Sequence, residues 1–233
     1  MKRFLLFLSF LLILSLESYG QGCVAIRHFS ACSPTYGETN ISPQGEFIFS
    51  MNYRYFKSFR HFRGTEEEPD RVTNETEVIN HSHAIDYQIA YGINDRLQAF
   101  ITLPFVINSR SSLYEHGRNE RNTTFSRGLG DITLGINYWM IDPYKNSNFN
   151  MQLGLGIKLP TGNYNYSDIF YNVGPDGGPE TRPVDQSIQV GDGGFGMMIQ
   201  GQAYFLMNEK SGLFLSGFYL FNPRATNGIR TFR

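Results

Sequence analysis

The sequence predicts an all-β protein, an antiparallel up-and-down β-barrel of the kind that crosses an outer membrane. Two observations predict this fold. The strand-like segments carry large apolar side chains at alternate positions, and the gaps between these segments are alternately long and short. Since a strand directs successive side chains to opposite faces, each segment has one apolar and one polar face. In a membrane barrel the apolar face contacts lipid and the polar face lines the lumen.

The N-terminal residues have the features of a secretory signal peptide. Two basic residues precede an apolar run at residues 4–16, and small residues at Ser18 and Gly20 end the segment. We therefore expect residues 1–20 to be a cleaved signal peptide and the mature chain to begin at Gln21. The apolar run is too short to cross a bilayer as a helix.

Two cysteines follow the predicted cleavage site. We expect residues 21–44 to form a periplasmic segment, and residues 45–233 to form the barrel. Cys23 and Cys32 remain in the exported chain, where disulfides are favoured. A disulfide between them is our prediction; the alternatives are a metal-binding pair or two free thiols.

The first four strand-like segments alternate clearly. Residues 45–56, 82–93 and 96–108 place most of their large apolar side chains at odd-numbered positions. Residues 131–140 follow with apolar side chains at the even-numbered positions, from Ile132 to Met140. Most of these segments reach or slightly exceed the length that a tilted transmembrane strand requires.

Three further segments complete the predicted set. In residues 149–160 every odd position is apolar, and no even position holds a large hydrophobic residue. Residues 194–207 also place most of their apolar residues at odd positions, whereas residues 213–221 are apolar on both faces. The sequence thus predicts about seven strands, and the register of the last one stays open.

The gaps between these strands alternate in length. Long and short gaps follow one another in the order 57–80, 94–95, 109–127, 141–148, 161–193 and 208–211. Outer-membrane barrels have long outer loops and short periplasmic turns. A soluble sandwich has no reason to alternate them so regularly, so the gaps favour the membrane barrel.

Charged and amide side chains on the polar faces are the candidate lining of a permeation path. The predicted lumen-facing residues are Glu46, Arg54, Asp86, Gln88, Arg96, Asp131, Gln152 and Lys158, and Gln98, Gln200 and Gln202 share this face. Two readings stay open. The charges form a satisfied internal network, or they line a water-filled path.

Three other groups of residues are weaker candidates for a nucleotide, metal or catalytic site. The glycines at 128–131 precede a strand rather than the helix that a nucleotide loop needs, so they indicate a barrel mouth or bend. His81 and His83 lack a third metal ligand. A barrel lipase needs an outward serine near His83, and Ser216 qualifies only if even positions of its strand face outward. We therefore predict no enzyme, no metal and no cofactor.

A family resemblance rests on two glycine-rich motifs. Residues 128–135 read Gly-Leu-Gly-Asp-Ile-Thr-Leu-Gly, and residues 154–162 read Gly-Leu-Gly-Ile-Lys-Leu-Pro-Thr-Gly. With residues 103–105 and 222–223, they make the chain resemble the outer-membrane barrels associated with the meta-pathway of phenol degradation, sometimes called transporters. The resemblance covers the chain from about Gly45 onward.

The resemblance implies an outer-membrane channel or transporter for small solutes, with aromatic or hydrophobic ones included. The alternatives are a structural or ligand-binding barrel without transport, and a barrel lipase. The expected partners are outer-membrane lipid and a small solute. Nucleic acid is not expected, because the formal net charge is only −1.

The strand number departs from the family pattern. Barrels of this family have more than seven strands, and bacterial single-chain barrels have an even number. We therefore expect the chain to be C-terminally incomplete, with further strands after Arg233.

Overall fold

The computed structural model describes residues 42–145, 148–208 and 211–223. The predicted signal peptide and the predicted Cys23–Cys32 disulfide lie outside these residues. The described residues lie almost entirely within residues 45–233, which are the predicted barrel.

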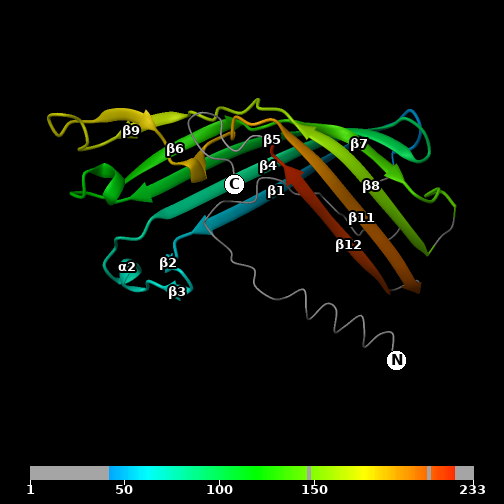
Figure 1. Cartoon of the computed structure of the whole chain (residues 1–233), viewed down its shortest axis with the longest axis horizontal. Coiled ribbons are helices and arrows are strands. Elements are labelled where there is room, and N and C mark those ends of the chain that lie inside the picture. Colours follow the sequence, from blue (N-terminus) through cyan, green and yellow to red (C-terminus); the bar gives the residue numbers. More distant parts are fainter. Residues whose placement is uncertain (1–41, 146–147, 209–210, 224–233) are drawn as a thin grey trace.

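One antiparallel sheet contains eight strands; seven of them follow one another in the order β1-β4-β5-β7-β8-β11-β12, and the eighth, β6 (Asn122–Leu129), pairs with β5 beside this path. The bounds of the seven are β1 Phe47–Ser58, β4 Ile79–Gly92, β5 Leu97–Ser112, β7 Thr133–Trp139, β8 Phe149–Lys158, β11 Gly196–Asn208 and β12 Ser211–Phe221. Each strand pairs with the long strand before and after it in the chain, and the sheet curls into a half-barrel with β1 and β12 at its edges (Figure 1). The prediction of an all-β, up-and-down sheet with about seven strands is confirmed.

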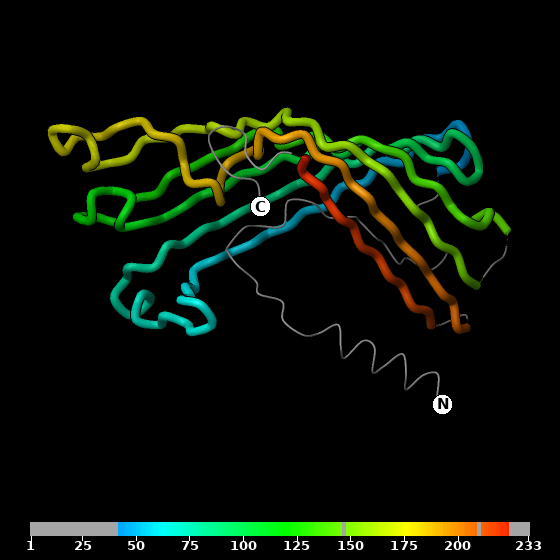
Figure 2. Tube along the Cα trace, viewed as in Figure 1, coloured from blue at the N-terminus to red at the C-terminus, as the bar shows by residue number. Residues whose placement is uncertain are grey.

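The long connections gather at one end of the sheet and the short turns at the other (Figure 2). This arrangement follows from the alternating gap lengths, because neighbouring strands run in opposite directions. We call these the long-loop end and the short-turn end.

The long connections contain more regular structure than the sequence indicated. The segment predicted as a loop at 109–127 is mostly strand, since β5 continues to Ser112 and β6 spans Asn122–Leu129. The other two long connections contain short elements, which are β2 Phe62–Arg63, β3 Glu66–Glu67, α2 Asp70–Thr73, β9 Ser167–Phe170 and β10 Glu180–Pro183. The 3-10 turns are η1 Tyr114–His116 and η2 Gln186–Ile188. β6 has polar residues on both faces, so its sequence shows no clear apolar alternation.

Strands β6 and β7 are two parts of one path along β5. β6 pairs with β5 from Phe105 to Ser112, and β7 pairs with it from Leu97 to Thr102. The interruption faces Pro104, which has no N–H group to donate to a ladder. The Pro104 carbonyl instead accepts a 2.7 Å hydrogen bond from the Gly130 amide.

The burial pattern is the reverse of that in a soluble domain. Among the described residues, eight hydrophobic and seventeen polar or charged side chains are buried. Large hydrophobic side chains stay exposed along one face of the sheet; Phe49 is 72% exposed and Leu155 is 60% exposed. No described helix is long and apolar enough to cross a membrane.

The pairing with β11 decides the register of β12. Ser216 lies opposite Gln202, and Leu215 lies opposite Ala203. The even positions of β12 therefore share the face of Gln202, and Leu215, which is 73% exposed, lies on the opposite, apolar face.

Candidate functional site on the inner face

The polar face of the sheet is its concave face, which we call the inner face. Its side chains form hydrogen bonds between strands that are not neighbours. Gln152 on β8 donates to Gln98 on β5 at 3.2 Å across β7, and Gln200 on β11 donates to Asn137 on β7 at 2.7 Å across β8. Side chains two strands apart converge in this way where a sheet curls toward them. The opposite, apolar face is the outer face.

Five amide side chains form a polar band near the short-turn end of the inner face. We call this band the amide ladder, and its members are Gln98, Asn137, Gln152, Gln200 and Gln202. Gln202 donates to Gln152 at 2.7 Å, and Gln98 donates to the Ser42 hydroxyl at 3.2 Å. Each amide carries both hydrogen-bond donors and an acceptor. The side chains of the ladder can therefore form hydrogen bonds with one another or with a polar solute.

Gly154 leaves the space through which one of these bonds passes. It lies between Asn137 and Gln200 in the register of the sheet. A Cβ atom there would stand 2.1 Å from Asn137 Oδ1 and 2.7 Å from Gln200 Cγ. The glycine is therefore required by the contact between β7 and β11.

An apolar strip crosses the inner face next to the amide ladder. Phe100, Gly135, Gly156 and Met198 lie side by side on β5, β7, β8 and β11. A Cβ atom at Gly135 would stand 2.9 Å from the Phe100 ring, and one at Gly156 would stand 3.0 Å from Met198 Cε. The two large side chains thus lie over the glycines and are buried.

A charged pair stands on the inner face of the first two long strands. Arg54 on β1 donates to Asp86 on β4 at 3.1 Å. Gln88 lies on the same face and accepts a 3.4 Å hydrogen bond from the Ser50 hydroxyl. Asp86 is buried, so its charge depends on Arg54 for compensation.

Asp131 joins three separate segments where β6 gives way to β7. Its carboxylate accepts 2.9 Å hydrogen bonds from the amides of Gly162 and Asp192. Lys158, the last residue of β8, forms an ion pair with Asp192 and lies 3.8 Å from Asp131. We call these contacts the Asp131 junction.

The two glycine-rich motifs of the sequence meet at this junction. The Thr161 hydroxyl donates to the Gly130 carbonyl at 3.0 Å and accepts from the Ile132 amide at 2.8 Å. Gly162 and Gly191 touch through their backbones, and a Cβ atom on Gly191 would stand 2.6 Å from the Gly162 carbonyl. The motifs thus hold neighbouring connections together at the end of the barrel strands.

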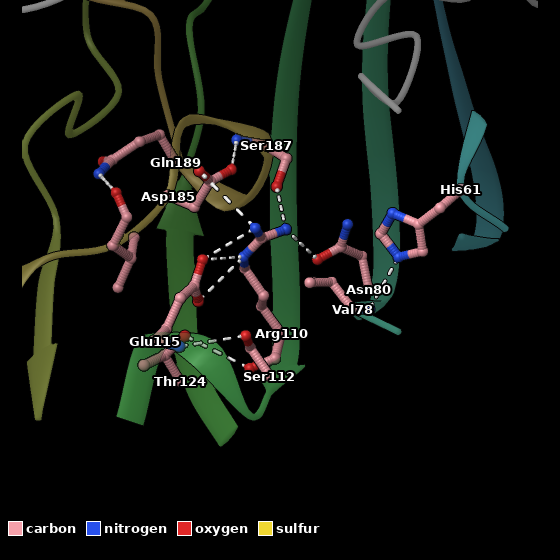
Figure 3. Close-up of polar contacts among 11 residues, drawn as sticks. His61, Val78, Asn80, Arg110, Ser112, Glu115, Thr124, Asp185, Ser187 and Gln189 are labelled. Atoms are coloured by element: carbon pink, nitrogen blue, oxygen red, sulfur yellow. Dashed lines mark hydrogen bonds and ion pairs between the residues drawn. The ribbon is translucent and has the colours of Figure 1, made fainter. Parts of the chain in front are cut away.

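Residues 184–192 lie against the inner face at the long-loop end, and we call them the inner segment. The segment contains η2, and its Ile188 carbonyl accepts hydrogen bonds from Asn108 on β5 and Ser126 on β6. Figure 3 shows Arg110 of β5 reaching from the strand to this segment and to Asn80 of β4.

Arg110 is the central cation of this region. It forms an ion pair with Glu115 at 2.8 Å and lies 3.8 Å from Asp185. It also donates to Asn80 at 3.0 Å and to the Ser187 hydroxyl at 3.4 Å. One guanidinium therefore connects β4, the β5–β6 hairpin and the inner segment.

The predicted lining residues occupy different parts of this face. Asp86, Gln152 and Lys158 are buried on the inner face, where Arg54 and Gln88 are half-buried, and Asp131 stands at the junction. Glu46 precedes β1 and is exposed, and Arg96 lies in the turn before β5. These last two stand at the short-turn rim rather than within the curled sheet.

The two histidines of β4 lie on the outer face with tyrosines of β1. Tyr53 Oη and His83 Nδ1 are hydrogen-bonded at 2.7 Å, as are Tyr55 Oη and His81 Nδ1. No group of three or more His, Cys, Asp or Glu side chains suited to a metal occurs in the part of the chain that the structure describes. Ser216 lies on the inner face, opposite to His83.

The comparisons with known proteins agree with this architecture. A family model described as "Putative MetA-pathway of phenol degradation" matches residues 110–178. The family resemblance is confirmed there. The match runs from Arg110 through β6, β7 and β8 to the β9–β10 connection, and it includes both glycine-rich motifs. No curated protein matches the chain.

Sequence reasoning missed several residues of the inner face. Asn108, Arg110, Ser126 and Asp192 were placed at a strand end or in predicted loops. A usable signal existed for Asp192, since Gly191-Asp192 resembles Gly130-Asp131, but nothing in the sequence shows that these two turns meet. Arg110 gave no such signal because, apart from Glu115, its partners come from distant segments.

Proposed function

We propose that the protein is an outer-membrane β-barrel through which small solutes pass along the inner face. The observation that carries the proposal is the reversed burial pattern, with exposed hydrophobic side chains on the outer face and buried polar ones on the inner face. Lipid is the environment in which such an outer face is stable. The family match supports the same conclusion.

The inner face suggests which solutes would pass. The amide ladder offers donors and acceptors that can replace part of a solute's hydration shell. The strip of Phe100 and Met198 beside it makes this part of the inner face apolar; both side chains are buried, so a ring or a short alkyl chain of a solute would contact them only where the packing over them opens. Small, uncharged solutes with one polar group and one apolar part, aromatic ones among them, match both surfaces.

The test is passage across a defined membrane. The protein, in a form whose sheet closes into a full barrel, would be refolded into liposomes. The release of small neutral solutes of increasing size would be followed together with conductance in planar bilayers. We expect release of small solutes and stepwise currents. Complete retention of all solutes and no current, from protein that migrates as a folded barrel on gels, would contradict the channel.

A barrel without transport is the second candidate function. The inner segment and the dense network around Arg110 favour it, because they occupy the concave side of the sheet. The same reconstitution separates the two functions, since a plugged structural barrel inserts into the bilayer but conducts nothing.

A further inference from the structure

We propose that the inner segment, residues 184–192, is the constriction that sets the size limit of the path. The proposal rests on the channel function proposed above. It assigns a role to Arg110, Asn108 and Ser126 as positioning residues that hold the segment on the inner face. The structure gives this segment features that an ordinary surface connection does not have.

The segment is packed rather than solvated. Val184, Ile188 and Val190 are among the few buried hydrophobic residues of the described chain, with exposures of 0%, 1% and 4%. Val190 lies beside Gly128 and Gly130 of the β6–β7 break, where a Cβ atom would meet it at 3.6 Å and 3.3 Å. The segment therefore lies on the strands instead of extending into solvent.

The segment also has a fixed shape. The Gln189 side chain donates to the Val184 carbonyl at 2.8 Å and accepts from the Tyr166 amide at 2.8 Å. Asp185 accepts a 2.8 Å hydrogen bond from the Ser187 amide, which caps η2. A loop closed by its own side chains keeps its position better than a flexible one.

Both ends of the segment are tied to the sheet. At one end Arg110 reaches Ser187 and Asp185, and at the other the Asp192 amide donates to Asp131 while the Asp192 carboxylate pairs with Lys158. These ties come from β5, β8 and the β6–β7 break. Displacing the segment requires breaking partly buried polar contacts at both ends.

The position of the segment makes it an obstacle to a passing solute. On β5 the exposed apolar side chains of the outer face end at Ile107, and the next residue, Asn108, holds the Ile188 carbonyl. The segment thus lies at the long-loop border of the apolar band, on the concave side. A solute that follows the inner face past this border must pass it.

Two kinds of variant test the constriction in opposite directions. Arg110→Gln, and the double variant Asn108→Ala with Ser126→Ala, remove the anchors, whereas Gln186→Trp adds bulk at an exposed position of η2. The matched controls are Arg182→Gln, whose ion pair with Glu180 lies within the exposed hairpin strand β10, and Thr181→Trp on the same strand. Folding of each variant is checked by heat-modifiable migration on gels.

The measurements are single-channel conductance and the largest neutral polymer that enters the pore. We expect the anchor variants to raise conductance about twofold and to admit larger polymers, because the narrowest part of a pore sets both quantities. Gln186→Trp should lower both, and the two controls should match the wild type. A closed wild type that conducts once Arg110 is replaced would also support the constriction.

Unchanged conductance and size limit in all three test variants, with a conducting wild type, would overturn the constriction and leave the channel intact. No current from the wild type or from any folded variant would overturn the channel itself and the constriction with it. Because each variant is first shown to migrate as a folded barrel, leakage from misfolded protein does not explain a gain in the anchor variants.

Discussion

At the scale of single residues, the polar side chains of the inner face depend on one another for hydrogen bonds and charge compensation. The hydrogen bond from Gln200 to Asn137 passes over a glycine, and the charge of Asp86 is compensated by Arg54. Buried polar groups without partners are costly, so each such contact constrains the residues around it. In the membrane barrel proposed above, the exposed apolar side chains of the outer face would be constrained by contact with lipid.

Gly154→Ala tests the first kind of constraint. The new methyl group would overlap Asn137 Oδ1, so we expect the Asn137–Gln200 bond to break and the barrel to lose about 1–3 kcal/mol of stability. Urea unfolding in lipid vesicles measures the change. Gly217→Ala is the matched control, because no atom lies within 4 Å of its added Cβ. Equal stability of the two variants would contradict the role of Gly154.

Leu155→Arg tests the outer face. Leu155 lies in the middle of β8 on that face, where an arginine at the bilayer midplane costs about 2–4 kcal/mol. Gln88→Arg is the comparison, since Gln88 is half-buried on the inner face, where a charge can be hydrated. We expect membrane insertion to fall for Leu155→Arg and to stay near the wild-type level for Gln88→Arg. The reverse order would show that the two faces are assigned wrongly.

At the scale of elements, the long connections are held to each other as well as to the sheet. His116 of η1 is buried, stacks on Phe170 at 5.4 Å between ring centroids, and accepts a 3.1 Å hydrogen bond from the Tyr171 amide. It thereby joins the tip of the β5–β6 hairpin to the end of β9. His61 does the same for the β1–β4 connection, accepting a 2.8 Å hydrogen bond from the Val78 amide.

Acidification should release the contact at His116. Burial lowers the pKa of His116 below its usual 6.5, while the carboxylates of Glu115 and Asp168 raise it by a smaller amount. The neutral ring accepts the Tyr171 N–H, so the contact is fully present above pH 6.5. Its contribution to stability is lost as the pH falls from 6.5 to the lowered pKa, because the unfolded imidazole binds a proton first.

Hydrogen exchange of the Tyr171 amide measures this effect. We expect protection at pH 7.5 and, after correction for the intrinsic pH dependence of exchange, progressively weaker protection as the pH falls below 6.5. His116→Gln provides the control, since a glutamine oxygen can accept the same hydrogen bond without titrating. Equal loss of protection in the wild type and in this variant would rule out His116 as the titrating group.

At the scale of the whole molecule, the curl of the sheet creates an inner face with charges of both signs. Positive and negative charges lie close together on this face. The charge of Arg54 is balanced by Asp86, and that of Lys158 is more than balanced by Asp131 and Asp192, so the described inner face has no cluster of charges of one sign. Such a surface is expected to select weakly between anions and cations. Selection by size and polarity then matters more for passage.

Arg54→Gln tests this balance. The substitution leaves the Asp86 carboxylate on the inner face without its cation, so cations should be favoured over anions. The reversal potential in a salt gradient should therefore move toward the value for cations, relative to a wild type near zero. An unshifted reversal potential would place Arg54 and Asp86 away from the path of the ions.

The sequence was sufficient for the long strands because their signal is local. In residues 149–160 the alternation alone specifies a strand with one apolar face, and β8 was found at Phe149–Lys158. β6 was not predicted because only two of its outer-face residues, Phe125 and Leu129, are apolar, which is too few to show a clear alternation. The sequence also does not predict which face of β12 points inward, because both faces are apolar and only pairing with β11 distinguishes them.

The sequence by itself determined the fold class, the strand order and the two chemically different faces, since these depend on alternation and on the lengths of connections. Only the tertiary structure decided which polar residues meet. The Asp131 junction and the Arg110 cluster join residues that are far apart in the chain, and no periodicity encodes such contacts. The same holds for the inner segment, whose residues read as an ordinary loop until the curl of the sheet brings Asn108 and Ser126 to the Ile188 carbonyl.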